Sequence, residues 1–198
     1  MDAHRDGDTR WPSANEHAPI DGPRLRFRPA TEADLPDIMR WRTDPGVLEF
    51  YRDPPSDLTE LRAHYLAAGP HQPVWRFVIE EAGRGVGCIQ YHHPYGGDEF
   101  DWTAGIDIFI GDPAARDHGV GTEAIRTMLA HLFETAGVHI VTIDPEVGNP
   151  RAIRCYEKAG FRLDGVLRHH TREGGVYIDT HFMSIVEDEW PAAKARWR

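Results

Sequence analysis

The stretch best suited to binding an anion is a loop that joins a predicted strand to a long predicted helix. The strand covers residues 102–110, the helix covers 119–136, and Arg116 stands between them. Gly119 and Gly121 open the helix. Glycine lets the backbone approach a ligand closely, and the first turn of a helix leaves N–H groups unpaired. Together with the helix dipole, this arrangement predicts an anion site suited to a pyrophosphate.

Two other phosphate-binding loops can be compared with this spacing. A P-loop needs a lysine and then a serine or threonine after its last glycine, and no lysine stands at that place. The dinucleotide-binding fingerprint accepts a residue such as Ala124 at its third glycine position and needs an acidic residue about twenty residues further on. Asp144 lies close to that distance, so spacing alone does not fully exclude this alternative.

Charge and composition restrict the class of protein. The 198 residues include 22 basic and 32 acidic side chains, and the formal charge is −10 with histidine neutral. This balance argues against duplex nucleic acid as a partner and is compatible with a cationic substrate. No apolar run approaches the ~20 residues of a membrane-spanning helix, and the N-terminus lacks an apolar signal-peptide core. The sequence therefore predicts a cytoplasmic protein without nucleic-acid or membrane partners.

Cysteine and histidine usage predicts neither a disulfide framework nor a metal site. Two cysteines are too few for such a framework. The chain has 12 histidines, but none has ligand spacing of the usual kind. His92-His93 and His169-His170 are adjacent pairs, whose side chains are expected on opposite faces of a strand.

Length and hydrophobic pattern predict one α/β domain with short tails. Residues 1–23 mix charged residues with glycine and proline and are expected to form a mobile N-terminal tail. The domain is expected over 24–190 and a short C-terminal tail over 191–198. Antiparallel strands in the first half and strand–helix crossovers in the second predict a mixed sheet. The expected strands lie near 25–28, 74–81, 86–92, 102–110, 139–143, 161–168 and 176–186, and the main helices near 57–68, 119–136 and 151–159.

Two motifs carry a family resemblance. Arg116-x-x-Gly119-x-Gly121 resembles the Arg/Gln-x-x-Gly-x-Gly/Ala acetyl-CoA motif of the GNAT N-acetyltransferases. Some thirty residues later, the run from Asn149 to Phe161 resembles the second cofactor motif of that superfamily. The resemblance extends over about 25–186. It implies a GNAT-type domain in which helices flank a mixed sheet of about six to seven strands with a splayed cofactor cleft.

The resemblance also implies how acetyl-CoA is bound and used. Backbone N–H groups of 116–122 would bind the pyrophosphate, and the strand edge at 107–110 would pair with the pantetheine arm and polarise the thioester carbonyl. Asn149 would contact the pantetheine. Tyr156 would protonate the departing thiolate in a direct attack through a tetrahedral intermediate. The expected cofactor-binding residues are Ile108, Ile110, Arg116, His118, Gly119, Val120, Gly121, Thr122, Asn149, Ala152 and Tyr156.

Tyr156 also has a purely structural interpretation. Together with Ile153 and Phe161, it is spaced to pack a helix end against the sheet. For an isolated tyrosine on an amphipathic helix this packing role is the simpler one, whereas its place in the motif favours the catalytic role.

Three segments, 47–51, 105–108 and 142–145, look like parts of the aminoglycoside 6′-N-acetyltransferases. In that group, acidic residues at the ends of two central strands meet ammonium groups of the drug. The match implies that Asp107 orients or deprotonates the attacking amine and that Asp144 binds a neighbouring ammonium. The expected catalytic residues are Asp107 and Tyr156, and the expected substrate-binding residues are Glu49, Phe50, Tyr51, Trp102, Asp107 and Asp144.

Other functions remain open. The stretches 161–168 and 184–190 are similar to ribosomal-protein N-terminal acetyltransferases, which take a peptide α-amine. A siderophore-type lysine acyltransferase and a non-catalytic acyl-CoA-binding sensor are further alternatives. Clustered carboxylates suit a compact polycation better than a peptide backbone. The sequence therefore favours an acetyl-CoA-dependent aminoglycoside 6′-N-acetyltransferase that confers resistance, as a monomer or homodimer with no metal.

Overall fold

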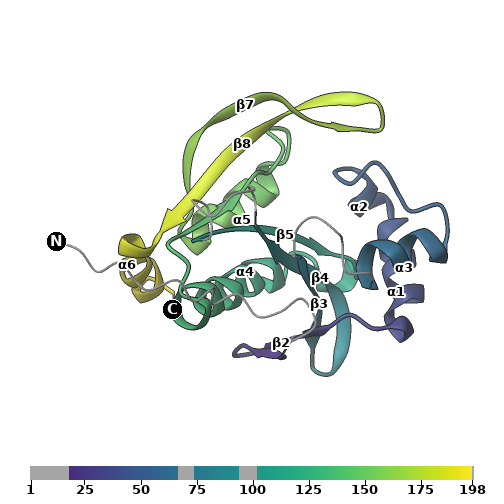
Figure 1. Ribbon diagram of the computed structural model, residues 1–198, viewed down its shortest axis with the longest axis horizontal. Helices are drawn as coiled ribbons and strands as arrows, with labels where there is room; N and C mark the ends of the chain where they lie inside the picture. Colours follow the sequence, from purple (N-terminus) through teal and green to yellow (C-terminus); the bar gives the residue numbers. More distant parts are fainter. Residues whose placement is uncertain (1–17, 67–73, 94–101, 198) are drawn as a thin grey trace.

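The computed structural model describes residues 18–66, 74–93 and 102–197. These residues form an eight-stranded mixed sheet in the order β1-β2-β3-β4-β5-β6-β8-β7 (Figure 1). Only the β5–β6 pair is parallel within the described sheet. The strands are β1 (Ile20–Asp21), β2 (Leu25–Pro29), β3 (Val74–Glu81), β4 (Arg84–His92), β5 (Thr103–Ile110), β6 (Ile140–Ile143), β7 (Arg162–Glu173) and β8 (Val176–Val186).

Helices cover both faces of the sheet. In Figure 1, α1 and α3 lie to the right of β3–β5, and α4 lies to the left. The first layer packs Ile38 and Trp41 against Val78 and Cys88. The helices are η1 (Glu32–Asp34), α1 (Leu35–Arg42), α2 (Pro45–Leu48), α3 (Leu58–Leu66), η3 (Pro113–Ala115), α4 (Val120–His131), η4 (Leu132–Ala136), α5 (Pro150–Ala159), η5 (Glu187–Glu189) and α6 (Trp190–Ala195).

The larger part of the core lies between α4 and the sheet. Ile125, Met128 and Leu129 follow helical spacing and are fully buried there. On the strands opposite them, Trp75 stacks on Tyr91 with ring centroids 4.8 Å apart. This packing fixes the helix that begins at the predicted anion loop.

The two central strands separate part-way along their length. β5 and β6 pair only between Thr103–Gly105 and Ile140–Thr142. β5 continues to Ile110, whereas β6 ends at Ile143 and is followed by Asp144 and Pro145. Proline lacks the N–H group that a ladder needs, so β6 stops there. The second half of β5 thus has a sheet partner on the β4 side only among the described strands, which is the splay that the sequence predicted.

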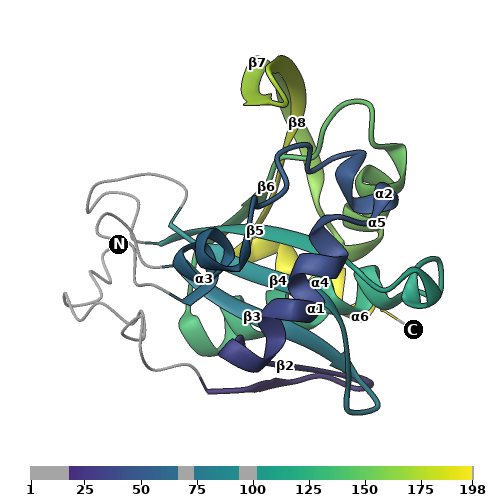
Figure 2. The ribbon, with the colours of Figure 1, turned by 90° about the vertical axis from the view of Figure 1, so that its right-hand side faces the viewer.

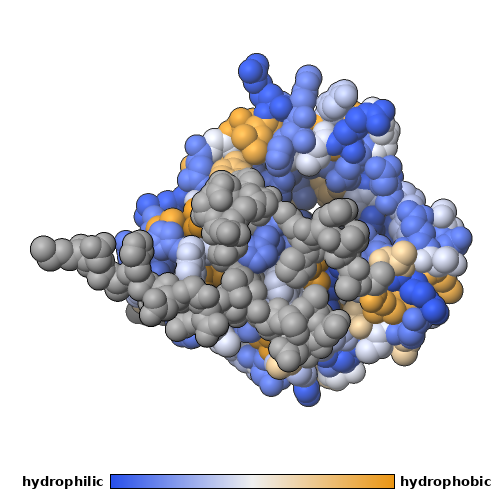
Figure 3. Space-filling view, viewed as in Figure 1, coloured by the Kyte–Doolittle hydropathy of each residue, from blue (hydrophilic) through white to orange (hydrophobic). Residues whose placement is uncertain are grey.

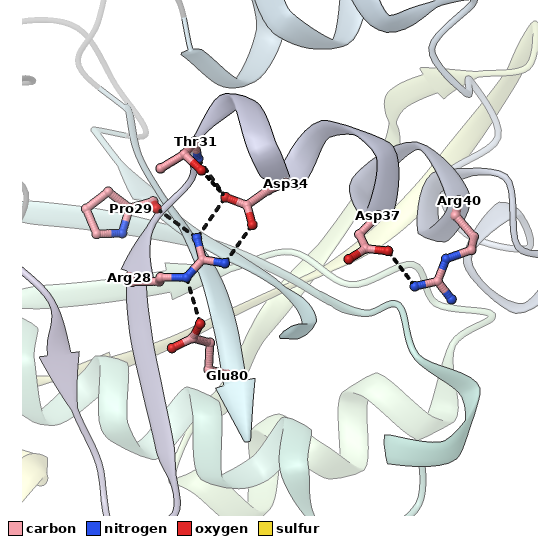
Figure 4. Close-up of polar contacts among 7 residues, drawn as sticks. All are labelled: Arg28, Pro29, Thr31, Asp34, Asp37, Arg40 and Glu80. Carbon is pink, nitrogen blue, oxygen red and sulfur yellow. Dashed lines mark hydrogen bonds and ion pairs between the residues drawn. The ribbon is translucent and has the colours of Figure 1, made fainter. Parts of the chain in front are cut away.

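A partly buried polar cluster fastens β2 and β3 to the start of α1 (Figure 4). The guanidinium of Arg28 donates to both carboxylate oxygens of Asp34, at 2.7 and 2.6 Å, and its Nε donates to Glu80 at 2.7 Å. Asp34 also accepts the backbone N–H of Thr31 at 2.8 Å. One carboxylate therefore caps the helix start and binds the strand. The exposed Arg40–Asp37 pair in the same view is expected to add little stability.

The β7–β8 hairpin projects beyond the sheet, as Figure 2 shows. Its turn, Gly174–Gly175, has positive φ at both residues, the backbone of a tight hairpin turn that glycine adopts without strain. Figure 3 shows apolar side chains among hydrophilic ones over this hairpin. The exposed apolar residues on its two strands are Leu163, Val166, Leu167, Val176 and Tyr177.

The fold class expected from the sequence is confirmed, with one more strand than expected. The added strand is β1, whose Ile20 is buried and pairs with Phe27, although the expected tail covered 1–23. At the other end, α6 runs into the expected tail at 191–198 and buries Ala193. Both segments join the domain because their apolar side chains are buried against it. Residues 1–17 lie outside the described part of the chain.

Candidate active site

The predicted anion loop leads from the end of β5 into α4. Gly119 has φ 82° and caps the helix, and its carbonyl accepts the N–H of Glu123 at 3.0 Å. Among the described residues, the backbone N–H groups of Val120, Gly121 and Thr122 have no protein acceptor. They stand at the positive end of a twelve-residue helix, so the loop offers several donors to an anion.

Neither loop glycine is required by a steric clash within the protein. A Cβ atom on Gly119 would meet no described atom within 4 Å, so glycine serves its left-handed backbone there. A Cβ atom on Gly121 would lie 3.6 Å from Cys155 Sγ, an ordinary contact. Internal packing therefore does not require glycine at 121. Close approach by a ligand such as a pyrophosphate provides a reason for it.

The guanidinium of Arg116 bonds to other groups of the protein. Its guanidinium pairs with Asp44 at 2.7 Å and donates to the carbonyls of Ile110 and Gly111, each at 2.9 Å. Its backbone N–H donates to Pro113 at 3.3 Å. The first residue of the sequence motif thus fastens the loop to β5 and α2, and its neighbours 120–122 supply the unpaired donors. His118 is exposed on the same loop.

The unpaired edge of β5 carries Ile108 and Ile110. Beyond β5, the N–H of Gly111 donates to Val86 on β4 at 2.9 Å. Because backbone groups alternate in direction along a strand, those of 108 and 110 point away from β4. Their carbonyls there accept the Tyr51 hydroxyl at 3.2 Å and Arg116 Nε at 2.9 Å. Their N–H groups lie on the same edge, toward the opening between β5 and β6.

Asn149 is the N-cap of helix α5. The Asn149 side chain accepts the backbone N–H of Ala152 at 3.0 Å. This bond occupies the Ala152 donor and leaves the Asn149 amide nitrogen as the free end of that side chain. Asn149 and Ala152 were both expected to contact the cofactor. In the structure they form the hydrogen bond that caps the N-terminus of α5.

Tyr156 is 7% exposed, and its ring lies 6.1 Å from that of Phe161, so the packing role is real. Burial raises the pKa of Tyr156, and the nearby Cys155, Asp107 and Asp144 raise it further. A phenol with a raised pKa keeps its proton at neutral pH and can donate it. The structure thus makes packing and proton donation compatible at this residue.

Asp107 lies on β5 just beyond its pairing with β6. Its Oδ2 atom accepts Gln90 Nε2 at 2.7 Å and lies 3.5 Å from His92 Nδ1, both from β4. A Cβ atom on Gly105 would lie 2.7 Å from His92 Nε2, so the glycine makes room for this imidazole. The sequence did not predict that Gln90 and His92 lie beside Asp107, because the pairing register of β4 with β5 decides which residues are neighbours across the two strands.

Asp144 follows the last residue of β6. Burial and the charge of Asp107 raise its pKa, while His170 and His92 act in the opposite direction. His170 Nδ1 lies 3.3 Å from Asp144 Oδ2. Gly105 and Thr142 form the last pair between β5 and β6, so Asp107 and Asp144 each stand two residues beyond it on neighbouring chain segments.

Glu49, Phe50 and Tyr51, which were expected to form one wall of the substrate site, directly follow α2. Burial and Asp107 raise the pKa of Tyr51, whose ring packs edge-on against Phe109 at 5.7 Å. Glu49 is exposed and Phe50 half-buried beside it. Trp102 precedes the other end of β5, roughly 16 Å of strand away from Asp107 at ~3.3 Å per residue. The structure does not bring Trp102 to the carboxylates.

A second polar network, absent from the sequence predictions, connects the wall to the hairpin. Arg52 pairs with both carboxylate oxygens of Glu146, with Nη2–Oε2 at 2.9 Å, and this bonding raises its pKa. The Arg52 N–H donates to Glu173 at 3.1 Å, and Asp53 accepts the N–H of Gly174 at 3.1 Å. In Figure 1 the hairpin correspondingly reaches toward α2.

Residues 24–162 match the family described as Acetyltransferase (GNAT) domain. The chain belongs to this family. The match spans β2 to the first residue of β7, and therefore the loop, both central strands and α5. The acetyl donor of this acetyltransferase is acetyl-CoA, which supplies an acetyl thioester. The unpaired donors at 120–122, the space at Gly121 and the open edge of β5 fit it.

Similar proteins include named aminoglycoside enzymes. Aminoglycoside N(6′)-acetyltransferase type 1 of Klebsiella pneumoniae is 27% identical over 153 residues, which is 72% of this chain and 76% of that protein. A kanamycin resistance protein of Rhizobium radiobacter is 40% identical over 63 residues, which is 32% of this chain and 58% of that protein.

Solved structures share the fold of this acetyltransferase. A putative acetyltransferase from T. thermophilus aligns with a TM-score of 0.76 and 26% identity, over 91% of this chain and 95% of that one. AAC(6′)-Ib in complex with paromomycin and acetyl-CoA aligns with a TM-score of 0.73 and 25% identity, over 88% of this chain and 98% of that one.

The described residues hold neither a metal-binding cluster nor a membrane-spanning helix. Within residues 18–66, 74–93 and 102–197, no group of three or more His, Cys, Asp or Glu side chains is arranged to hold a metal ion. The helices described over the same residues are all too short or too polar to cross a bilayer.

Proposed function

We propose that this acetyltransferase transfers the acetyl group of acetyl-CoA to the 6′-amine of an aminoglycoside and thereby confers resistance. The observation that carries the proposal is the pair of carboxylates just beyond the β5–β6 ladder, Asp107 within β5 and Asp144 directly after β6. Both charges act on buried Tyr156. These positions support a site in which two carboxylates bind the amine and Tyr156 donates a proton.

The charge of the site suits a compact polycation. Aminoglycosides carry several ammonium groups, and neighbouring carboxylates attract and orient such a ligand. Asp144 binds one ammonium, while Asp107 orients the reacting nitrogen and takes its proton, directly or through water. The nitrogen must lose that proton because only its lone pair can attack the thioester. Glu49, Phe50 and Tyr51 form one side of this pocket.

The remaining steps use groups on the cofactor side. N–H groups of Ile108 and Ile110 bind the pantetheine arm and polarise the thioester carbonyl. Tyr156 gives its proton to the departing thiolate. The similarity to enzymes named as aminoglycoside N(6′)-acetyltransferases supports this substrate class.

The test follows thiol release from acetyl-CoA by the purified full chain over a panel of amines. Release is expected with kanamycin and tobramycin and not with an aminoglycoside whose 6′ position carries a hydroxyl, which is the matched control. Mass spectrometry of the product should show one added acetyl group on the 6′ nitrogen. Release with peptide α-amines alone would identify a peptide N-terminal acetyltransferase, and cofactor binding without turnover would identify a sensor.

A second test measures resistance in cells. Expression of the wild-type chain should raise the kanamycin concentration that inhibits growth, and expression of Asp107→Asn at equal abundance should not. Equal protection by both proteins would contradict the role of Asp107.

A further inference from the structure

Strand β7 carries a bulge beside the candidate site. Its register with β8 shifts between Leu167 and Thr171. Within the bulge, His169 has φ 53°, a left-handed conformation that a residue with a side chain seldom adopts. Its N–H donates to Asp179 Oδ1 on β8 at 2.8 Å, and its ring stacks on Tyr177 with centroids 5.6 Å apart. The strained backbone is thus held from the neighbouring strand.

The bulge decides where His170 points. Adjacent side chains of a regular strand lie on opposite faces, and a bulge changes that direction. His170 Nδ1 lies 3.0 Å from Thr180 Oγ1 and 3.3 Å from Asp144 Oδ2. The histidine is therefore carried by β7, contacts β8, and faces the carboxylate that follows β6.

Strand β8 also holds the segment that bears Asp144. The N–H of His181 donates to the carbonyl of Pro145 at 2.8 Å, and the N–H of Val147 donates to the carbonyl of Asp179 at 3.0 Å. Asp179 thus supports both sides: its side chain fixes the bulge, and its carbonyl fixes the loop after β6. The relative position of His170 and Asp144 is consequently built into the sheet.

Two other charged groups act on Asp144 from neighbouring strands. The groups that act on the Asp144 carboxylate, besides His170, are Asp107 from β5 and His92 from β4. The charge of Asp144 in turn reaches Tyr156 on α5. An imidazolium at His170 would neutralise part of this acidic site.

We propose that His170 is a specificity-determining residue that, when protonated, pairs with Asp144 and competes with a substrate ammonium for it. The inference rests on the proposed function in one respect, that Asp144 receives a substrate cation. Imidazolium and ammonium repel each other at one carboxylate, so protonation of His170 weakens binding of a cationic amine.

The experiment measures binding of kanamycin to the full chain saturated with coenzyme A, by calorimetry at about pH 6 and about pH 8. His170→Gln can still donate a hydrogen bond to Asp144 but carries no charge at either pH. The wild type is expected to lose about fivefold more affinity than His170→Gln on acidification, since an exposed ion pair has about this strength. Protonation of Asp144 itself contributes to both proteins and does not explain the difference.

Three further variants separate charge competition from a structural effect. His139→Gln is the matched control, because His139 Nδ1 also faces a carboxylate, Glu187, at 3.5 Å. It should keep the wild-type pH dependence. His169→Gly should keep it too, because glycine adopts the left-handed backbone freely. Asp179→Ala should approach His170→Gln, because the bulge loses its hydrogen bond.

The outcomes distinguish this inference from the proposed function. Equal pH dependence of kanamycin binding in wild type and His170→Gln overturns the role of His170 and leaves the aminoglycoside as substrate. Should kanamycin not bind, the same comparison uses the KM of whichever peptide amine releases coenzyme A. A His170-dependent KM then supports the inference although the proposed substrate is wrong. Amine binding independent of His170 throughout, or no amine binding at all, overturns it.

Discussion

Arg116 and Asp44 form an ion pair of 2.7 Å that ties the cofactor loop to the start of α2. Asp44 also accepts the N–H of Gly46 at 3.0 Å and so caps that short helix. Burial opposes the charge on Asp44, but its bonds to Arg116 and Gly46 prevail and lower its pKa. The loop that offers donors to the cofactor and the segment that leads to Tyr51 thus share one anchor.

We expect Arg116→Met to weaken acetyl-CoA binding about tenfold and to destabilise the fold by about 1–3 kcal/mol. The change leaves Asp44 and two carbonyl groups without their donor, which is the reason for the loss. Calorimetry with acetyl-CoA and urea unfolding measure the two effects. Arg84→Met, which removes an exposed pair with Asp112, serves as the control and should leave both unchanged. Unaltered acetyl-CoA affinity in Arg116→Met would contradict the anchoring role.

Asp107→Asn should lower kcat/KM for kanamycin by about 10²- to 10⁴-fold while acetyl-CoA binding stays near normal. The amide cannot take the proton of the reacting ammonium. Steady-state kinetics and cofactor calorimetry separate the two effects. Gln90→Leu should cause a smaller loss, about tenfold, because it removes the 2.7 Å hydrogen bond that orients the carboxylate. Full turnover by Asp107→Asn would remove this residue from the mechanism.

Tyr156→Phe should slow the chemical step by about 10²-fold or more with little change in acetyl-CoA affinity. Pre-steady-state thiol release measures this step directly. Because burial and its neighbours raise the pKa of Tyr156, the phenol stays protonated through neutral pH. We therefore expect no loss of kcat from this group below about pH 10 in the wild type. Unchanged release by the phenylalanine variant would leave Tyr156 with its packing role alone.

Arg52→Met should release the segment after α2 from the hairpin. Its guanidinium is the group that joins Glu146, and the loss of that pair frees a half-buried carboxylate. We expect faster hydrogen exchange at Tyr51 and Gly174, with a KM for kanamycin raised about threefold or more and little effect on acetyl-CoA binding. Exchange rates equal to those of the wild type at both positions would show that the network does not hold the wall.

Asp34→Asn should reduce the free energy of unfolding by about 1–3 kcal/mol at neutral pH, because it weakens a two-oxygen bond with Arg28. Burial alone would raise the pKa of Asp34, but hydrogen bonds from Arg28 and Thr31 outweigh it and lower the pKa. A lowered pKa means that the carboxylate stabilises the fold above about pH 4 and loses this effect as pH falls through its folded value. Urea unfolding at several pH values should show a smaller acid-side decline in the variant.

Local patterns in the chain predicted many of the elements closely. The expected strand 74–81 coincides with β3, and the expected helices 119–136 and 151–159 correspond to α4 with η4 and to α5. These elements carry their own signals, such as helical spacing of apolar residues and a capping Asn149. Boundaries near the termini differed, because burial of Ile20 and Ala193 depends on contacts with distant residues.

The sequence by itself determined the order of the elements and predicted the glycine loop between β5 and α4, since both depend on neighbours in the chain. Only the tertiary structure decided which partners the carboxylates of Asp107 and Asp144 have. Gln90 and His92 reach Asp107 through cross-strand register, and His170 reaches Asp144 through a bulge that alternation along a regular strand does not predict. The tertiary structure likewise sets the distance of Trp102 from Asp107, because Trp102 precedes β5 and Asp107 lies within it. The sequence states the chemical type of each side chain directly, whereas the distance between two side chains on different strands depends on how the strands pair.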